Sequence, residues 1–210
     1  MTMKATRRSA LALAILALLA EEPMHPYRMQ QLIKQRHKEA VVNVRLRSSL
    51  YQTIDRLERA GLIAVQETER ADNRPERTIY RLTSEGAATA RQWLREMLAH
   101  PVNEYPEFPA ALSFLPLLPP DEALALLVTR EQALATEIAE IDGKLAAVGP
   151  WLPRLFILEV DYQRTMLETE RRWLEQVIAE MQAGDLHWDD AWLREQAAPP
   201  EEVMRALERR

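Results

Sequence analysis

The chain has 210 residues, of which 47% are hydrophobic and 28% are charged, a composition typical of a globular protein with a packed core. This length suits one or two domains, and the composition excludes a chain that is disordered by default. Cysteine is absent. The chain therefore has no disulfide bond, no thiolate nucleophile and no thiolate metal ligand.

The charge is divided unevenly between the two halves of the chain. Residues 1–100 contain 17 Lys and Arg against 11 Asp and Glu, a net charge of +6, whereas residues 101–210 contain 10 against 21, a net charge of −11. The whole chain has a net charge of −5. Proteins that bind nucleic acid concentrate basic residues on the contacting domain. We therefore expect such contact from the first half and a different role for the second.

An apolar run over residues 10–20 follows a basic N-terminus, which is also the arrangement of a secretory or twin-arginine signal peptide. The run is too short to span a bilayer, and Leu18 stands three residues before the possible cleavage point, where a small residue is needed. We interpret residues 8–20 as a first helix and expect no transmembrane segment and a cytoplasmic protein.

Pro26 is well placed to begin a second helix, because proline is favoured in the first helical turn. Its expected apolar face contains Tyr27, Met29, Leu32 and Ile33. The pattern fades over residues 36–39. The β-branched stretch Val41–Val44 then predicts a connector or a brief strand.

Leu50, Ile54 and Leu57 recur at helical spacing and define the buried face of a third helix. Ser49 and Gln52 have the spacing of a capping box, so we expect the helix to begin there. The opposite face is polar and contains Arg47, Ser48, Tyr51, Gln52, Asp55, Arg56 and Arg59. Such a face is typical of a recognition helix, whose first turn reaches base edges in the DNA major groove.

Gly61 ends this helix, and two strands over about residues 63–69 and 77–82 flank the polar turn 71–75. The arginines of this hairpin are Arg70, Arg74 and Arg77. Arginines on such a wing contact phosphates or the minor groove. A solvated surface is the simpler explanation for any single arginine. The order helix, glycine, strand, basic turn, strand and helix favours a DNA-binding winged helix.

Thr83 and Gly86 are expected to open a fourth helix, and the proline-punctuated residues 101–109 to form a linker. Residues 110–185 predict an all-helical region with two long amphipathic helices, one from Pro119-Pro120 to Gly149-Pro150 and one over about residues 153–183. The remaining residues, 186–210, predict a tail with a short helix after Pro199-Pro200.

Two long amphipathic helices cannot bury their apolar stripes on each other alone. We expect a second copy of the chain to cover the exposed stripe, because most soluble oligomers are twofold homodimers. Packing of this stripe on the chain's own first domain is the alternative.

Several residue groups resemble the PadR family of bacterial transcription regulators. They are Pro23-Met24-His25-Pro26-Tyr27, Ser48-Ser49-Leu50-Tyr51, Arg56-Leu57-Glu58-x-x-Gly61-Leu62-Ile63, Arg74-Pro75-x-x-x-x-Tyr80-x-Leu82-Thr83-x-x-Gly86 and Glu170-Arg171-Arg172-Trp173-Leu174. The resemblance spans roughly residues 10–183. Pro26 stands where many members have glycine, and Asn73-Arg74 stands where Gly-Arg is common, so these loops are expected to differ locally.

The resemblance implies a mainly α fold with a small β-hairpin wing. A winged helix-turn-helix domain would occupy residues 1–100, and the helical C-terminal region would be an antiparallel dimerisation domain. The resemblance also implies a homodimer that binds an inverted-repeat operator in double-stranded DNA, usually a repressor. Half-site centres would then lie about 34–36 Å apart.

The resemblance also implies roles for individual residues. Tyr51 would contact the DNA backbone with Ser48 and Ser49 beside it, and Arg74 and Arg77 would be wing contacts. From its place on the first exposed turn, Gln52 could bind adenine or a phosphate. Tyr27 and Tyr80 are expected to pack inside the winged domain. The full predicted DNA-binding set is Arg47, Ser48, Ser49, Tyr51, Gln52, Arg56, Arg70, Arg74 and Arg77.

Several family members sense small aromatic or multidrug-like compounds in the dimer or interdomain region, so the resemblance implies a small aromatic or hydrophobic effector here. Large apolar side chains that could line its pocket are Phe114, Trp151, Phe156, Tyr162, Met166 and Trp173. Packing in the protein core is the favoured alternative for these six residues.

No enzymatic activity, metal or cofactor is expected. The four histidines are scattered, and the chain has neither a Gly-x-Ser-x-Gly motif nor a glycine-rich phosphate loop. A third hypothesis is a protein-interaction adaptor on a winged fold, since fold does not fix function. Convergence of the arginines at positions 47, 56, 70, 74 and 77 on one face would distinguish a DNA-binding protein from such an adaptor.

Overall fold

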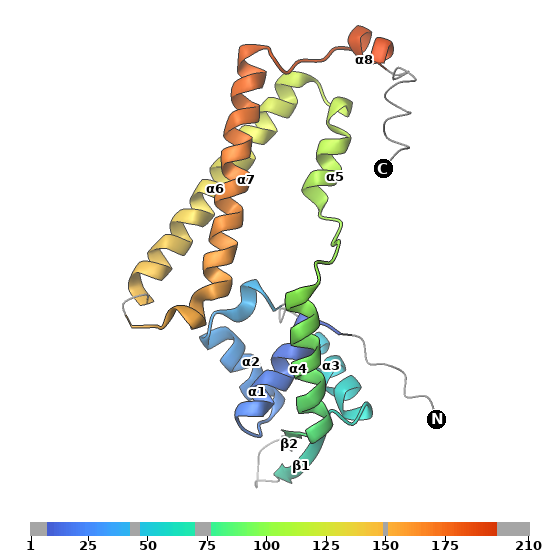
Figure 1. Cartoon of the computed structure of the whole chain (residues 1–210), viewed down its shortest axis with the longest axis vertical. Helices are drawn as coiled ribbons and strands as arrows, with labels where there is room; N and C mark the ends of the chain where they lie inside the picture. Colours follow the sequence, from blue (N-terminus) through green and yellow to red (C-terminus); the bar gives the residue numbers. More distant parts are fainter. Residues whose placement is uncertain (1–7, 43–46, 70–76, 149–150, 197–210) are drawn as a thin grey trace. The chain divides into compact units, whose positions relative to one another are not determined.

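A computed structural model describes residues 8–42, 47–69, 77–148 and 151–196 (Figure 1). The chain divides into two compact units, residues 1–103 and 104–210. The first unit contains α1 (Ala10–Glu21), α2 (Pro26–Gln35), the 3-10 helix η1 (Lys38–Ala40), α3 (Arg47–Arg59), β1 (Ile63–Glu69), β2 (Arg77–Leu82) and α4 (Ser84–Ala99). The second contains α5 (Glu107–Ser113), η2 (Leu115–Leu117), α6 (Pro120–Val148), η3 (Arg154–Ile157), α7 (Leu158–Ala183) and α8 (Asp190–Gln196). The predicted class, mainly helical with one small hairpin, is confirmed.

Helix α1 is the central apolar helix of the first unit. Its N-cap is Ser9, whose hydroxyl accepts a hydrogen bond from the Ala12 amide at 3.2 Å. Ile15 and Leu16 are completely buried. The apolar run thus packs as a core helix. Within the described parts of the chain, we find no helix with the length and apolar character that a bilayer span requires.

Helix α2 begins at Pro26, as predicted. His25 is its N-cap, and the His25 Nδ1 accepts a hydrogen bond from the Arg28 amide at 3.1 Å. The prediction that Tyr27 lies on the apolar face is wrong. Tyr27 is more than half exposed and stacks on the His25 ring, because its position in the first turn points away from buried Met29 and Ile33.

Helix α3 buries the predicted face of Leu50, Ile54 and Leu57. The predicted capping box is wrong, because the helix already includes Arg47, and Ser49 lies within its first turn. The Ser49 carbonyl accepts a hydrogen bond from the Thr53 hydroxyl at 2.7 Å, a bond typical of a helix interior.

The helix ends at Gly61, whose φ of +71° falls in the left-handed region that favours glycine. The Leu62 amide then donates to the Leu57 carbonyl at 3.0 Å. This bond closes the helix and turns the chain into β1.

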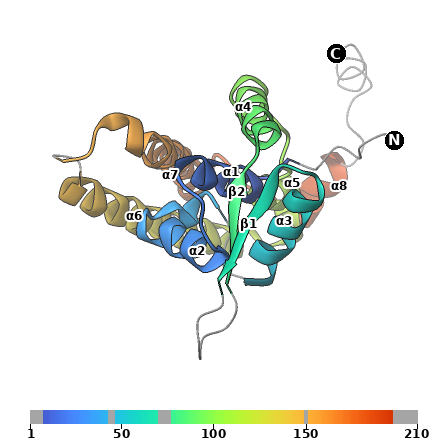
Figure 2. The ribbon, with the colours of Figure 1, turned by 90° about the horizontal axis from the view of Figure 1, so that it is seen from below.

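Strands β1 and β2 form the predicted antiparallel hairpin, with Ile63 opposite Leu82 and Glu69 opposite Arg77. The register shifts between Val65 and Glu67, which marks a bulge. In Figure 2 the two strands run side by side with α3 next to β1. We call this hairpin the wing; its predicted polar turn, residues 71–75, lies outside the described residues.

Contacts with the residues before α2 and with the start of α4 hold the base of the wing. Met24, before α2, forms an isolated antiparallel bridge with Tyr80, with N···O distances of 3.0 and 3.1 Å. Thr83 caps α4, as predicted, by accepting a hydrogen bond from the Gly86 amide at 2.9 Å. A Cβ atom on Gly86 would lie 1.9 Å from the Leu62 carbonyl oxygen, so glycine allows α4 to approach β1.

The second unit is built on the antiparallel pair α6 and α7. Its core includes Ala123 and Leu174, both completely buried. Ion pairs join the two helices along their length, including Arg130 with Glu170 at 2.6 Å and Arg171 with Glu131 at 2.6 Å. Arg164 pairs in the same way with Asp142. These ion pairs fix the register of α6 relative to α7.

Two segments of the second unit differ from the sequence-based expectation. Helix α5 begins at Glu107, inside the expected linker 101–109, because Pro106 supplies an extended residue just before the first turn. The segment expected as a tail includes α8, which precedes Pro199-Pro200. Trp188 is buried in the core of the unit, and its indole N–H donates to the Leu118 carbonyl at 3.0 Å. The expected short helix after Pro199-Pro200 lies outside the described residues.

Candidate nucleic-acid interface

The outward face of α3 is polar and open to solvent. Its exposed side chains are Ser48, Tyr51, Gln52, Asp55 and Arg59. This face exists because Leu50, Ile54 and Leu57 turn toward α1 and the rest of the first core. Tyr51 remains 50% exposed on this face.

Arg56 does not lie at the centre of this face. Its side chain turns toward the start of α1, where Nη2 donates a hydrogen bond to the Ser9 hydroxyl at 3.4 Å. The Arg56 Nε is buried and has no hydrogen-bond partner among the described residues. The structure therefore places the Arg56 side chain at the edge of this face, where α3 meets the start of α1.

The structure describes only part of the predicted basic surface. Arg47 is the first helical residue of α3 and Arg77 the first residue of β2, with their backbones described but not their side chains. Arg70 and Arg74 lie outside the described residues. Ser49 is half-buried beside the exposed Ser48. Convergence of the five arginines on one face thus remains a prediction.

Tyr80 connects the wing to α3. Its side chain packs against the core of the first unit, as predicted. Burial raises the pKa of the Tyr80 phenol, and the nearby charges of Glu58 and Asp55 and the Tyr51 phenol raise this pKa further. Carboxylates of α3 therefore lie close to the base of the wing. The phenol stays protonated at neutral pH and keeps a hydrogen-bond donor.

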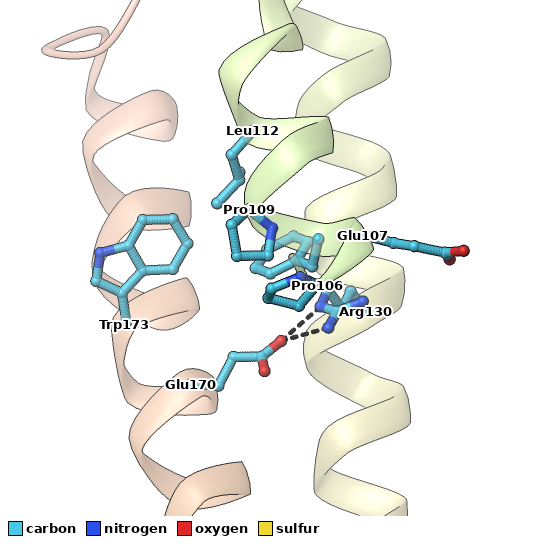
Figure 3. Close-up of a pocket in the computed structure, with 8 residues that line it drawn as sticks. Pro106, Glu107, Pro109, Leu112, Arg130, Glu170 and Trp173 are labelled. Atoms are coloured by element: carbon cyan, nitrogen blue, oxygen red, sulfur yellow. Dashed lines mark hydrogen bonds and ion pairs between the residues drawn. The ribbon is translucent and has the colours of Figure 1, made fainter. Parts of the chain in front are cut away.

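An open groove of about 580 Å³ lies within the second unit, between α5, α6 and α7 (Figure 3). Its lining residues are Pro106, Glu107, Phe108, Pro109, Leu112, Arg130, Glu170 and Trp173. In Figure 3 Trp173 faces Pro109 and Leu112 of α5, while Glu107 points away. The groove thus offers aromatic and apolar walls to a small molecule.

Two of the charged groups that line the groove, Arg130 and Glu170, pair with each other. Arg130 Nε donates to Glu170 Oε1 at 2.6 Å, and the Arg130 guanidinium lies 3.7 Å from the centre of the Phe108 ring. Phe108 meets Trp173 edge to face, with ring centres 6.2 Å apart. A ligand here would meet mainly the faces of Phe108 and Trp173.

The six residues predicted for an effector pocket do not meet in one place. Trp173 alone among them lines this groove, and all six are exposed, from 43% for Trp173 to 86% for Trp151. The others are Phe114, Phe156, Tyr162 and Met166. Because all six are exposed, they do not form the core of the single chain, which was the alternative, and the predicted effector pocket stays a prediction. Helical spacing shows which residues share a face but does not show what covers that face.

Phe108, Arg130 and Glu170 were not predicted to line a pocket, although Glu170 belongs to one of the family-like motifs. Phe108 falls within the predicted linker, and the two charged residues have the pattern of solvated positions on long helices. The two prolines near Phe108 could have pointed to this groove, because Pro106 and Pro109 both line it. Among the residues described, no group of three or more His, Cys, Asp or Glu side chains is arranged to hold a metal ion.

Comparison with known proteins identifies the first unit. The model of the PadR-like transcriptional regulator family matches residues 15–92, from within α1 to within α4. No curated protein sequence matches the chain.

Solved structures share the fold over about four fifths of the chain. Bacillus subtilis PadR in complex with operator DNA is 20% identical, with 82% of this chain and 99% of that chain covered and a TM-score of 0.66. The same protein in complex with p-coumaric acid is 19% identical, with 83% and 99% covered and a TM-score of 0.66. The Vibrio cholerae virulence activator AphA is 18% identical, with 82% and 98% covered and a TM-score of 0.63. At these identities the likeness concerns the fold, and the family model adds the identity of the first unit: residues 15–92 are a domain of the PadR-like transcriptional regulator family, built as a winged helix.

Proposed function

We propose that the protein is a homodimeric repressor that binds an inverted-repeat DNA operator and is released by a small-molecule effector. The outward face of α3 is the principal support. It presents Ser48, Tyr51 and Gln52 together on the first turns of a helix beside a two-stranded wing. A winged helix places such a face in the major groove, where an amide can pair with adenine.

One structural neighbour supports the DNA part of this proposal, because B. subtilis PadR is seen in complex with operator DNA. The direction of regulation does not follow from the fold, since AphA is a virulence activator. Repression rests on the family resemblance, which implies a repressor more often than an activator. A regulator must reach the chromosome, so the proposal includes a cytoplasmic location.

An exposed stripe on α7 supports a homodimer. Tyr162, Met166 and Trp173 project within about 40° of one another around the helix axis, and each is at least 43% exposed. An apolar stripe of this kind marks an interaction surface. A second copy of the chain would cover it and would place two α3 helices for two half-sites.

The groove of the second unit supports an effector. Phe108 and Trp173 would contact a flat aromatic ring, and a neighbouring structure holds p-coumaric acid. We therefore replace the six-residue pocket by this groove. The family and these neighbours are transcriptional regulators, which supports a regulator rather than an enzyme.

The proposal is tested by fluorescence anisotropy of the full-length protein on DNA from immediately upstream of its own gene and on random DNA, across a salt series. We expect tight binding at near-physiological salt with a preference of about 1,000-fold or more over random DNA. Equal, purely salt-driven binding to both DNAs would contradict an operator at this position. No binding to either would favour the adaptor hypothesis.

A further inference from the structure

Asp55 lies at the centre of the outward face of α3. Ser48, Asp55 and Arg59 project within about 40° of one another around the helix axis. Tyr51 and Gln52 stand one turn before Asp55, at positions i−4 and i−3, and all five side chains are exposed. Any DNA bound by this face would therefore lie against the Asp55 carboxylate.

The Asp55 carboxylate has no salt-bridge partner among the described residues. Arg59, one turn later, donates from Nε to the backbone carbonyl of Asp55 at 3.1 Å, so this bond is not made to the carboxylate. Glu58 and Asp55 both lie near the Tyr80 phenol, so the neighbouring carboxylate adds negative charge. The face proposed to meet DNA thus contains a carboxylate that forms no ion pair among the described residues, although Arg59 lies one turn away.

A free carboxylate on such a face is repelled by phosphates and weakens binding to every DNA sequence. It becomes favourable where it accepts a hydrogen bond from a base. Guanine presents two acceptors in the major groove, adenine presents an acceptor beside its amino group, and thymine presents an acceptor and a methyl group. Cytosine presents a donor alone, its N4 amino group.

We infer that Asp55 is a specificity-determining residue that accepts a hydrogen bond from N4 of one cytosine in each half-site. This inference rests on the proposed function, because it needs α3 in the major groove. The carboxylate would favour cytosine at that position by about 10-fold over the other bases. It would also lower affinity for random DNA.

The test is a binding-site selection from duplex DNA with a randomised core that spans two half-sites, performed with the full-length protein and three variants. Asp55→Asn keeps the shape and introduces an amide, which pairs with adenine N6 and N7. Asp55→Ala removes the acceptor. Glu85→Gln removes one negative charge from an exposed position on α4, outside the face. Circular dichroism checks that the variants keep the wild-type helical content.

We expect the wild type and Glu85→Gln to select the same motif, with one cytosine per half-site. Asp55→Asn should change the preference at that single position to adenine, and Asp55→Ala should lose it, with the rest of the motif unchanged. Both Asp55 variants should bind random DNA more tightly than the wild type.

Two results would overturn the inference, and they can be told apart. If all four proteins select an identical motif, Asp55 does not contact a base, while the proposed DNA-binding function stands; a gain in affinity for every sequence would then show that Asp55 acts through charge alone. If the wild type selects no motif, the proposed sequence-specific function fails and the inference fails with it.

Discussion

The two units differ in how completely they bury their apolar side chains. In the first unit, α1, α2, α3, α4 and β1 all contribute to one core cluster, and Ile15, Ile54 and Leu57 are completely buried. In the second unit, α6 and α7 bury Leu174, while Tyr162 on the same helix is 68% exposed. The first unit completes its core within one chain. The second presents an apolar surface, the kind that a partner covers.

The two units also differ in the polar interactions that hold their elements together. In the first unit, Ser9, His25 and Thr83 cap the N-termini of α1, α2 and α4 by accepting hydrogen bonds from backbone amides. In the second unit, partly exposed ion pairs between α6 and α7 fix the register of the two helices. Such pairs contribute little to stability individually, about 0–1 kcal/mol each. The first unit is therefore stabilised by contacts within its own chain. The stability of the second unit depends in addition on the partner that covers its apolar surface.

The largest expected effect is that of Gly86→Ala, which tests the close packing of the first unit. The new Cβ would overlap the Leu62 carbonyl oxygen, so α4 must move away from β1. We expect a loss of about 3 kcal/mol or more in the free energy of unfolding, measured by urea denaturation of the full-length protein.

The matched control lies in the second unit. Gly143 is a helical glycine of α6, and a Cβ there would meet nothing within 4 Å. Gly143→Ala should therefore stabilise the protein by up to about 1 kcal/mol. Equal effects of the two substitutions would contradict the difference in packing between the two units.

The next effect tests the exposed stripe of the second unit. The double variant Tyr162→Ala with Met166→Ala should raise the dimer dissociation constant by about tenfold or more, because both side chains would lie in the interface. Sedimentation equilibrium measures this constant. The control is Tyr51→Ala, which truncates an exposed tyrosine of the first unit and should weaken DNA binding and leave the dimer intact. A dimer unaffected by the double variant would place the interface elsewhere.

A smaller effect is expected from Gln52→Ala. Loss of the amide should relax discrimination at one base pair by about 1–3 kcal/mol, measured by anisotropy with single-substituted operators. Gln182→Ala, at an exposed position of α7, should change neither discrimination nor affinity. If Gln52→Ala weakens binding to specific and random DNA equally, Gln52 contacts the DNA backbone instead of a base.

The smallest expected effect is on the pH dependence of stability, and it involves one ion pair in each unit. Hydrogen bonds from Arg36 lower the pKa of Glu21, and a hydrogen bond from Arg164 lowers the pKa of Asp142. A lowered carboxyl pKa stabilises the fold above the group's ordinary pKa, 4.5 for Glu21, and the contribution is lost as pH falls through the lowered value.

Arg36→Gln should therefore reduce stability at pH 7 by at most about 0.5 kcal/mol, because the pair is exposed, and should leave stability at pH 3 nearly unchanged. Arg164→Gln should show the same direction. Urea midpoints at the two pH values measure both effects. A larger loss at pH 3 than at pH 7 would reverse the sign and contradict the assigned ion pairs.

Much of the first unit was predictable because single residues there impose strong backbone constraints. Gly61 ends α3 with a positive φ, Pro26 begins α2 and Thr83 caps α4, and each acts within a few residues of its own position. The capping box at Ser49 failed because a serine and a glutamine at this spacing also fit a helix interior. The exposed face of α3 was predictable from helical spacing. The position of Arg56 at its edge depends on α1 and was not.

The second unit was less predictable because its decisive contacts join distant segments. Phe108 meets Arg130 and Trp173 only after α5 packs against α6 and α7. The periodicity of α7 marks the stripe of Tyr162 and Met166 but does not say whether another element of the same chain covers it. Burial of side chains is a property of the assembled structure, and the sequence pattern of one helix does not contain it.

Trp188 determines where a fragment containing the second unit can end. This residue follows α7 by a few positions, yet its indole fills the core beside Leu118, at the entrance to α6. A fragment that stops at Gly184 would remove a core side chain and leave the Leu118 carbonyl without its donor. The smallest autonomous fragment must therefore extend past Trp188. For the same reason, a protease cut between α7 and Trp188 should loosen the start of α6, far along the sequence from the cut.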